Sequence, residues 1–394
     1  MAERSVEPWL RRHAGGVGFE VAAVETDRAQ LVWADLPEGT HTLRAGRRAL
    51  VLETAGGPGS FELTDLAPGS RTEVRLEVGE QTLRRVVHTL LAPPGPSRFR
   101  FATISDLHLG RGDRQYRGPL AHRGVDEPPE GVPVDDAGVP ARQLINARAA
   151  VDEALAWGAE HLVVKGDVTE ETTAGTWDQA ASLLGELPVP ASVLAGNHDT
   201  GGLAEFDPFV GAAERGLRLT RGVDHVDVPG LRIVLVDSTL PGSGWGAVAR
   251  HSEAAATLAA EAGSGVFVAT HHHPQRFSVP VFWPHGIPGP DARRFAGAVV
   301  AANRRVLASS GHTHRNRRRS VARMPWTEVA ATNHFPGVWA GYEVHDGGIR
   351  QVVRRIAAPE VLEWSHRSRH AFGGAWALWS TGSMADRCFS LTWS

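Results

Sequence analysis

One pattern, found five times along the chain, limits the possible folds more than any other feature. Each time, an apolar run of strand length is followed at once by residues of the types that bind metal ions. The five runs lead to Asp106-x-His108, Gly166-Asp167, Asn197-His198-Asp199, His272-x-Pro274 and His312-x-His314. Side chains two apart in a strand point the same way, so an Asp-x-His at a strand end directs a carboxylate and an imidazole to one point. We expect the five endings to build one metal site.

The composition is that of an ordinary globular protein, with 394 residues, 42% hydrophobic and 22% charged. No apolar stretch is long enough to span a membrane, and the first residues lack the apolar centre of a signal peptide. The net charge of −3 gives no electrostatic reason to expect nucleic acid or a membrane surface as a partner. With Cys388 as the one cysteine, no intrachain disulfide can form, which suits a reducing compartment. We therefore expect a cytoplasmic location.

Residues 1–96 are predicted to form an all-β domain. Short β-type runs alternate there with Gly and Pro clusters at the spacing of a sandwich. Residues 63–78, together with Trp33 on an early run, resemble a fibronectin type III domain. Residues 93–96, Pro-Pro-Gly-Pro, are typical of a short stiff linker. We expect this domain to serve packing or to join copies of the chain into a homo-oligomer.

From residue 97 onward, strand patterns alternate with helical ones, which indicates an α/β layered fold. Three segments between residues 143 and 262 carry apolar residues at helical spacing. For residues 97–358 we predict a two-sheet β-sandwich flanked by helices. Residues 359–394 are expected to pack back on this domain, because they are rich in tryptophan. These tryptophans are Trp364, Trp376, Trp379 and Trp393.

Taken together, the five motifs resemble the calcineurin-like metallophosphoesterases over residues 99–345. The resemblance implies an αββα fold and two metal ions bridged by Asp167, since a carboxylate has an oxygen for each ion. It assigns Asp106, His108 and His314 to one ion, and Asn197, His272 and His312 to the other. Oxygen and imidazole ligands suit Mn, Fe, Zn or Co better than Mg or Ca.

Two neighbouring residues, His198 and Asp199, have a different expected role. In the family, the histidine at His198 faces the substrate phosphate and helps to protonate the leaving oxygen. Asp199 is placed to fix the tautomer of that histidine, as carboxylates near metal sites commonly do. The alternative role for Asp199 is a helix or turn cap.

Backbone and side-chain positions near the predicted ligands are constrained as well. In the run His271-His272-His273-Pro274, the family pattern selects His272, and alternation along a strand would turn its two neighbours away. Gly196 and Gly311 stand where the backbone must pass close to the metal ligands, so we expect neither position to accept a Cβ.

Two arginine-containing segments are candidates for contacts with the substrate. Residues 111–140 lack periodicity and leave directly from the site, which indicates either a lid or a solvated linker. Their candidate side chains are Arg111, Arg114, Tyr116, Arg117, His122 and Arg123. The second segment follows His314 and is either a solvated turn or a phosphate clamp. Its members are Arg315, Arg317, Arg318 and Arg319.

The resemblance implies a phosphoester hydrolase in which a hydroxide bridging the two metal ions attacks phosphorus. Residues 165–170 and 231–246 are similar to the bacterial cyclic-nucleotide phosphodiesterase branch, which lies near the purple acid phosphatase-like proteins. We therefore expect a phosphodiesterase with a small substrate, for which a nucleotide is one candidate. The alternatives are a phosphomonoesterase or pyrophosphohydrolase on the same site and, in another class, a metal-stabilised binding or scaffold protein.

Overall fold

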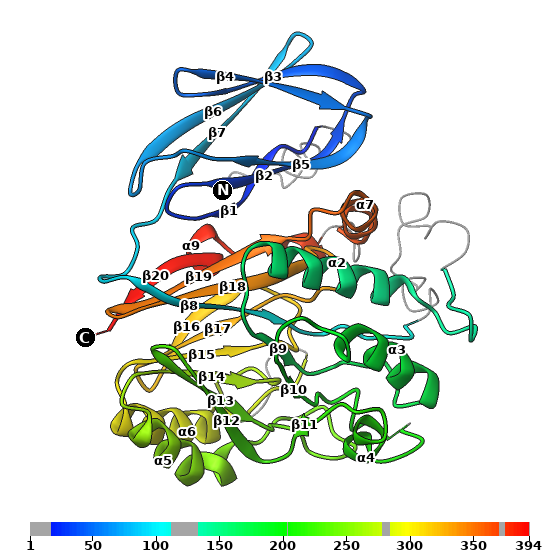
Figure 1. Cartoon of the computed structure of the whole chain (residues 1–394), viewed down its shortest axis with the longest axis vertical. Helices are drawn as coiled ribbons and strands as arrows, with labels where there is room; N and C mark the ends of the chain where they lie inside the picture. The colour runs from blue at the N-terminus through cyan, green and yellow to red at the C-terminus, as the bar shows by residue number, and fades with distance from the viewer. Residues whose placement is uncertain (1–16, 112–132, 203, 278–283, 370–374, 394) are drawn as a thin grey trace, which may run out of the picture.

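Two large sheets face each other in the computed structural model, which describes residues 17–111, 133–202, 204–277, 284–369 and 375–393 (Figure 1). The seven-stranded sheet has the order β11 (Leu219–Thr220), β10 (Ala191–Leu194), β9 (Leu162–Lys165), β8 (Ser97–Ile104), β18 (Val338–His345), β19 (Gly348–Arg355) and β20 (Cys388–Thr392). The six-stranded sheet has the order β12 (Val223–Val228), β13 (Leu231–Val236), β14 (Gly265–Thr270), β15 (Val306–Ser310), β17 (Met324–Glu328) and β16 (Arg317–Val321).

The central strands of both sheets run parallel, and this brings the five motifs together. Strands β8, β9 and β10 are parallel neighbours, and so are β13, β14 and β15. The carboxyl ends of parallel strands meet at one edge of a sheet, so the loops after these strands are neighbours. All five predicted motifs follow such ends.

Aromatic side chains fill the space between the two sheets. The ring centroid of Phe101 on β8 lies 4.9 Å from that of Phe267 on β14 and 4.8 Å from that of Tyr342 on β18. Such short edge-to-face and stacked pairs add to the stabilisation that burial alone provides. These three residues are fully buried, so they hold the sheets at a fixed separation below the motifs.

Helices cover the outer faces of both sheets, as the apolar periodicity predicted. Helices α2 (Arg142–Ala156), α3 (Ala174–Leu184) and α4 (Pro208–Ala213) share one apolar cluster with β8, β9 and β10. The short η2 (Ala249–His251), α5 (Ser252–Glu261) and α6 (Gly289–Ala302) lie on the other sheet, and the helices α5 and α6 share a cluster with β13, β14 and β15. The predicted α/β class, a two-sheet sandwich flanked by helices, is confirmed.

The N-terminal part of the chain is an all-β sandwich, drawn in blue in Figure 1. One of its sheets has the order β1 (Glu20–Val24), β2 (Ala29–Leu36) and β5 (Gly57–Leu63). The other has the order β4 (Arg48–Thr54), β3 (Gly39–Ala45), β6 (Arg71–Val78) and β7 (Gln81–His88). The fibronectin type III assignment and the domain boundary at residue 96 stay predictions.

A buried polar network joins this sandwich to β19. Glu25 is 3% exposed, and its carboxylate accepts hydrogen bonds from the guanidinium of Arg354 (2.7 Å), the indole of Trp157 (3.1 Å) and the guanidinium of Arg350 (3.3 Å). Glu62 of β5 forms a second ion pair with Arg354. Arg350 and Arg354 of β19 therefore form ion pairs with carboxylates of the N-terminal sandwich.

The C-terminal residues form part of the body, with helices α7 (Pro359–Ser368), α8 (Ala375–Ser380) and α9 (Met384–Arg387) before β20. Strand β20 pairs with β19 at the edge of the seven-stranded sheet. Three indole N–H groups donate to backbone carbonyls in loops after β15 and β17. The pairs are Trp364 with Asn333 (2.8 Å), Trp376 with Phe335 (2.9 Å) and Trp379 with Thr313 (3.3 Å). These hydrogen bonds tie the tryptophan-rich segment to two loops, one of which carries the fifth motif.

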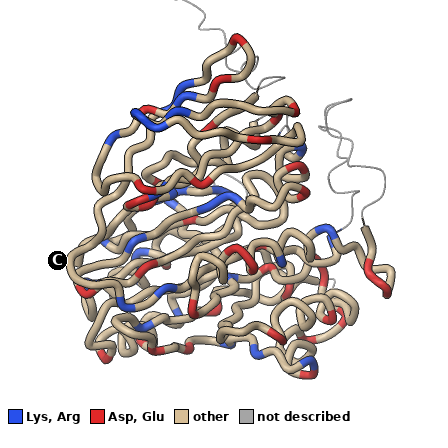
Figure 2. The backbone as a smooth tube through the Cα atoms, turned by 45° about the horizontal axis from the view of Figure 1, so that its top comes forward, with Lys and Arg blue, Asp and Glu red and all other residues tan. Residues whose placement is uncertain are grey.

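Charges of both signs are interspersed along the chain, as Figure 2 shows. This agrees with the formal net charge of −3. None of the helices within the described ranges has the length and the apolar character that crossing a membrane requires.

The network around Glu25 gives a prediction about stability. Replacing Glu25 by Ala leaves Arg350 without one of its carboxylate partners and removes one from Arg354, so we expect the free energy of unfolding to fall by about 3 kcal/mol. Denaturant titration followed by tryptophan fluorescence measures this. Glu77→Ala is the matched control, because Glu77 pairs with Arg44 at the surface and should contribute about 1 kcal/mol or less. Equal losses in the two variants would contradict the prediction.

Candidate metal centre

A left-handed backbone at the strand ends places the predicted ligands. Five of them have positive φ: Asp106 (55°), His108 (51°), Asp167 (48°), His312 (68°) and His314 (51°). Non-glycine residues seldom adopt this conformation, and where they do the surrounding structure must hold them there. Strand β8 ends at Ile104, before Asp106. The alternation of side chains along a strand, on which the prediction rested, is therefore not what makes these groups converge.

The first group of ligand atoms comes from the first and fifth motifs. Nε2 of His314 lies 3.3 Å from Oδ1 of Asp106 and 3.2 Å from Nε2 of His108. The carboxylate and the two imidazoles are close enough together to hold one ion. This is the set predicted for one of the two metals.

Asp167 lies between two groups of possible ligands. Its Oδ2 is 3.7 Å from Nε2 of His108, and its Oδ1 is 3.3 Å from Nε2 of His271. The backbone N–H of His198 also donates to Oδ1, at 2.9 Å. One carboxylate oxygen thus faces each group, which is the arrangement that a bridging ligand requires.

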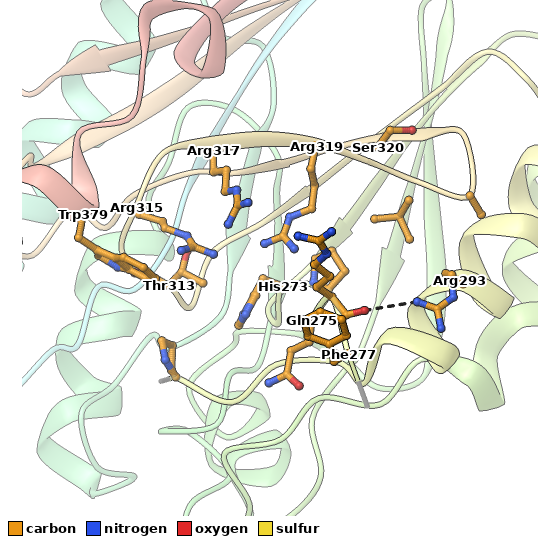
Figure 3. Close-up of a pocket in the computed structure, with 15 residues that line it drawn as sticks. His273, Gln275, Phe277, Arg293, Thr313, Arg315, Arg317, Arg319, Ser320 and Trp379 are labelled. Atoms are coloured by element: carbon orange, nitrogen blue, oxygen red, sulfur yellow. Dashed lines mark hydrogen bonds between the residues drawn. The ribbon is translucent and has the colours of Figure 1, made fainter. Parts of the chain in front are cut away.

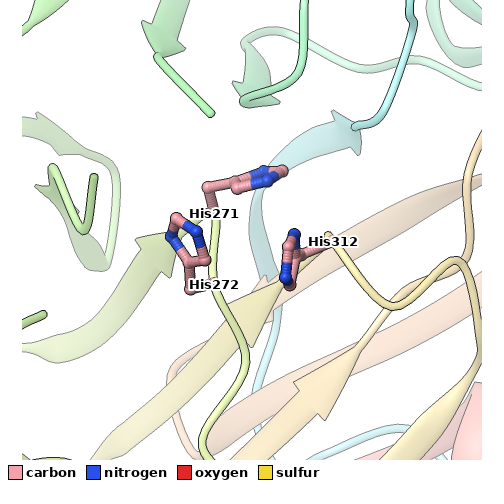
Figure 4. A group of neighbouring side chains, drawn as sticks. All are labelled: His271, His272 and His312. Atoms are coloured by element: carbon pink, nitrogen blue, oxygen red, sulfur yellow. The ribbon is translucent and has the colours of Figure 1, made fainter. Parts of the chain in front are cut away.

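The second group is formed by His271, His272 and His312 (Figure 4), and Asn197 lies beside His271. Nε2 of His271 lies 3.1 Å from Oδ1 of Asn197. His312 donates from Nε2 to the carbonyl of His285 at 2.6 Å, which leaves its Nδ1 free to bind a metal ion. Nε2 of His272 is buried and has no hydrogen-bond partner among the described residues.

The structure places His271 differently from the prediction. Alternation was expected to turn this residue away, but β14 ends at Thr270, so the histidine run lies beyond the strand and alternation does not apply. The Nδ1 of His271 donates to the carbonyl of Lys165 at 2.8 Å, which leaves Nε2 directed at Asp167. A histidine held in this way by one nitrogen is typical of a metal ligand. His271 therefore joins His272 as a candidate.

Sequence reasoning missed the groups that orient the predicted ligands. Glu170 lies 2.7 Å from Nδ1 of His108, and Nε2 of His334 lies 3.0 Å from Nδ1 of His314. Glu170 follows Asp167 by three residues in the second motif, and that short spacing was the one available signal. His334 is remote from its partner in the sequence, so only the fold brings the two together.

The expected role of Asp199 is wrong. Its carboxylate accepts from the backbone N–H groups of Gly196 (2.8 Å), Thr169 (2.8 Å) and Val168 (3.1 Å). It therefore fastens the loops after β9 and β10 to each other, which corresponds to the alternative role as a cap. His198 instead donates from Nδ1 to the carbonyl of Glu170 at 3.0 Å.

The expectation for the two glycines is confirmed. A Cβ on Gly196 would lie 2.1 Å from Oδ1 of Asp167, and one on Gly311 would lie 2.5 Å from Oδ2 of Asp106. Both contacts are far below van der Waals distance. Close approach to a carboxylate, and not a positive φ, is therefore the reason for glycine at these positions.

The charges of the site suit cations. Burial lowers the pKa of His108 to about 4, although Glu170 acts in the opposite direction, so the imidazole is neutral. Burial would raise the pKa of Asp167, but the nearby imidazoles hold it well below its usual value. Burial would also lower the pKa of His271, but Asp167 outweighs it and raises the pKa to about 9. The site thus contains neutral imidazole ligands, ionised carboxylates and a position that stabilises positive charge, and it fits divalent metal ions.

The arginine segments are only partly visible in the structure. Arg114, Tyr116, Arg117, His122 and Arg123 lie outside the described residues. Arg111 is described, and its Nε lies 3.8 Å from Oε2 of Glu170. In the second segment, Arg317, Arg318 and Arg319 lie on β16 and Arg315 precedes the strand. Arg315, Arg317 and Arg319 line a cavity beside the centre.

No protein-family model matches the chain, and no curated protein matches it. Among solved structures, the chain is similar to PhoD, with 9% identity, 85% of each chain covered and a TM-score of 0.42. It is also similar to a purple acid phosphatase from yellow lupin (Lupinus luteus) seeds, with 10% identity, 87% of this chain and 72% of that chain covered and a TM-score of 0.43. A third similar structure is a dimetal phosphatase from Danio rerio, with 11% identity, 76% of this chain and 100% of that chain covered and a TM-score of 0.44. These similarities are distant and say nothing about the activity of this chain.

The order of the five motifs along the chain resembles that of the calcineurin-like metallophosphoesterases, and their side chains converge at one edge of the two-sheet sandwich. Two groups of ligand atoms on either side of Asp167 make the centre a candidate for two metal ions.

The histidine run gives a second prediction. His271→Ala should lower the metal content from about two ions per chain toward one, because Nε2 of this residue faces Asp167 and Asn197. Elemental analysis of the reconstituted proteins measures this, with His272→Ala prepared in parallel. His225→Ala is the control, since this histidine of β12 lies at the surface near Asp227 and its loss should leave the metal content unchanged. Full occupancy in His271→Ala would exclude this residue as a ligand.

Proposed function

We propose that the protein is a binuclear metal-dependent phosphoester hydrolase that acts on phosphodiesters. The observation that carries this proposal is Asp167, which directs one carboxylate oxygen to each of two groups of buried ligand atoms. A centre of this type suits hydrolysis, because two bound cations neutralise charge on the phosphoryl oxygens and acidify a water molecule. Mn, Fe, Zn and Co remain the candidate metals.

The residues that would hold the ions are those of the two groups. We assign Asp106, His108 and His314 to one ion, and Asn197, His312 and one or both of His271 and His272 to the other, with Asp167 shared. Glu170, His334 and the carbonyls of Lys165 and His285 fix the orientation of four of the imidazoles. Partners of this kind fix the tautomer and the ring orientation of a metal-binding histidine.

His198 is proposed to face the substrate and to protonate the leaving oxygen. Its side chain is 36% exposed, whereas that of His108 is 2% exposed, so a substrate can reach it. The bond from its Nδ1 to the carbonyl of Glu170 fixes the ring and leaves Nε2 to hold a proton for transfer. The ring centroids of His198 and His108 are 4.6 Å apart, and this short distance from a predicted metal ligand supports the proposed role.

The second candidate is a phosphomonoesterase or pyrophosphohydrolase on the same site. The arginine-lined cavity beside the centre favours it, since a more anionic substrate would be attracted there. A nucleotide substrate, a cytoplasmic location and self-association through the N-terminal sandwich remain predictions.

The third prediction tests the shared ligand. Asp167→Asn should reduce binding of both metal ions and abolish hydrolysis of bis-p-nitrophenyl phosphate in the presence of Mn, because an amide has no charge to share between two cations. Metal content and turnover are measured on the same samples. Asp178→Asn is the matched control, since Asp178 pairs with Arg215 at the surface. Hydrolysis by wild type that persists after removal of metal by a chelator would contradict the proposed function.

The fourth prediction separates His198 from the ligands. His198→Ala should keep its metal content and lose roughly 10²- to 10⁴-fold in kcat, the usual contribution of a positioned general acid. The loss should be larger for an alkyl phosphodiester than for a nitrophenyl ester, because an alkoxide needs a proton more than a nitrophenolate does. Equal losses on the two substrates would reduce the role of His198 to orientation, and a loss of metal would make it a ligand.

A further inference from the structure

A cavity of about 480 Å³ opens beside the metal centre (Figure 3). Its wall includes His273, whose ring stacks on that of His312 with 5.7 Å between the centroids. It also includes Thr313, which lies between two of the predicted ligands. The cavity is therefore one side chain away from the second group of ligand atoms.

Alternation along β16 decides which arginines of the run after His314 line this cavity. Arg317 and Arg319 line it, together with Arg315 from the loop before the strand. Arg318 points to the opposite face, where its guanidinium lies 4.0 Å from the ring centroid of Phe389. Three of the four arginines therefore face the cavity. The phosphate clamp considered in the sequence analysis can apply to these three, but not to Arg318.

The positive charge of the cavity exceeds the charge available to neutralise it. Glu328 is fully buried behind the wall and forms ion pairs with both Arg315 (2.7 Å) and Arg319. One carboxylate is therefore the ion-pair partner of two guanidinium groups. Arg317 makes no hydrogen bond or ion pair with any residue in the described ranges, and Arg293 of α6 adds a further cation to the wall.

Two buried nitrogen atoms in the wall have no hydrogen-bond partner among the described residues. They are Nδ1 of His273 and Nε of Arg319. His273 is 5% exposed. Burial lowers the pKa of Arg317, and the neighbouring Arg319 and Arg315 lower it further. Groups of this kind are stabilised when an anion enters.

We propose that this cavity binds a second phosphoryl group of the substrate while the metal centre holds the phosphoryl group that is hydrolysed. The assignment rests on the proposed function, because it takes the metal centre as the place of hydrolysis. Guanidinium groups bind phosphoryl oxygens in a planar, two-point manner, and several of them converge here from β16 and α6. The substrate class is then a phosphoester that carries a further phosphate near the scissile one.

The test compares a two-phosphoryl probe with a one-phosphoryl probe in full-length, metal-loaded protein. Methylenediphosphonate cannot be hydrolysed and has two phosphoryl groups, whereas methylphosphonate has one. Calorimetric titration should give a dissociation constant for methylenediphosphonate about tenfold higher in Arg317→Gln than in wild type. The constant for methylphosphonate should change much less, because the metal centre alone can bind that probe.

Two matched pairs of variants separate the cavity from general charge effects. Arg318→Gln removes the same charge from the opposite face of β16 and should leave both constants unchanged. Arg293→Gln removes a lining residue of α6, and Arg294→Gln removes its exposed neighbour, which does not line the cavity. Arg293→Gln should weaken binding of methylenediphosphonate and Arg294→Gln should not. The two pairs also keep the test decisive if one variant fails to fold.

The outcomes distinguish this inference from the proposed function. Equal affinities of Arg317→Gln and Arg318→Gln for methylenediphosphonate would overturn the inference, whatever the activity. An equal loss for both probes in Arg317→Gln would overturn it too, because the cavity would then bind free phosphate and not a second group of the same molecule. If wild type hydrolyses no phosphoester but the variants differ as expected, the proposed function fails and the two-phosphoryl site stands.

Discussion

The metal centre depends on a backbone conformation that is intrinsically unfavourable for its residues. Positive φ costs a non-glycine residue about 1–2 kcal/mol, and five predicted ligands adopt it. Backbone hydrogen bonds hold these residues in place. The N–H of Asp106 donates to the carbonyl of Gly166, and that of His108 donates to the carbonyl of Asp167, both at 3.0 Å. These bonds continue the pairing of β8 with β9 beyond the ends of the strands, so the parallel sheet itself stabilises the strained residues.

The same constraint explains why carboxylates serve two purposes at this site. The N–H of His312 donates to Oδ1 of Asp106 at 2.9 Å, and the N–H of His198 donates to Oδ1 of Asp167 at the same distance. Each carboxylate therefore fixes a neighbouring loop while its oxygens remain close to the other ligands. Such close contact between a loop and a carboxylate leaves no space for a Cβ at Gly311. The positions of the predicted ligands and the conformations of the loops therefore depend on the same contacts.

Much of the site could be predicted from the sequence, because its signals are local. An apolar run followed by Asp or His marks a strand end, and parallel strand ends must meet. What the sequence could not supply are contacts between residues far apart in the chain, such as that of His314 with His334. It also could not show that β14 ends before His271. Beyond the end of a strand the alternation of side chains stops, so a boundary misplaced by one residue changes the direction in which a side chain is expected to point. The misassigned role of Asp199 has a related cause, since a carboxylate next to a histidine in sequence need not face it in space.

One short segment connects the parts of the molecule on which substrate binding is proposed to depend. Residues 312–319 carry two predicted ligands, His312 and His314, and then pass into β16, whose arginines line the neighbouring cavity. The indole of Trp379 donates to the carbonyl of Thr313 between those ligands, and the guanidinium of Arg315 lies 4.0 Å from the same ring system. The tryptophan-rich C-terminal segment therefore supports the metal loop and the cavity wall at once. Because both sites lie on one supported segment, their separation is fixed by the fold, and a substrate that spans them would be selected by the distance between its anionic groups.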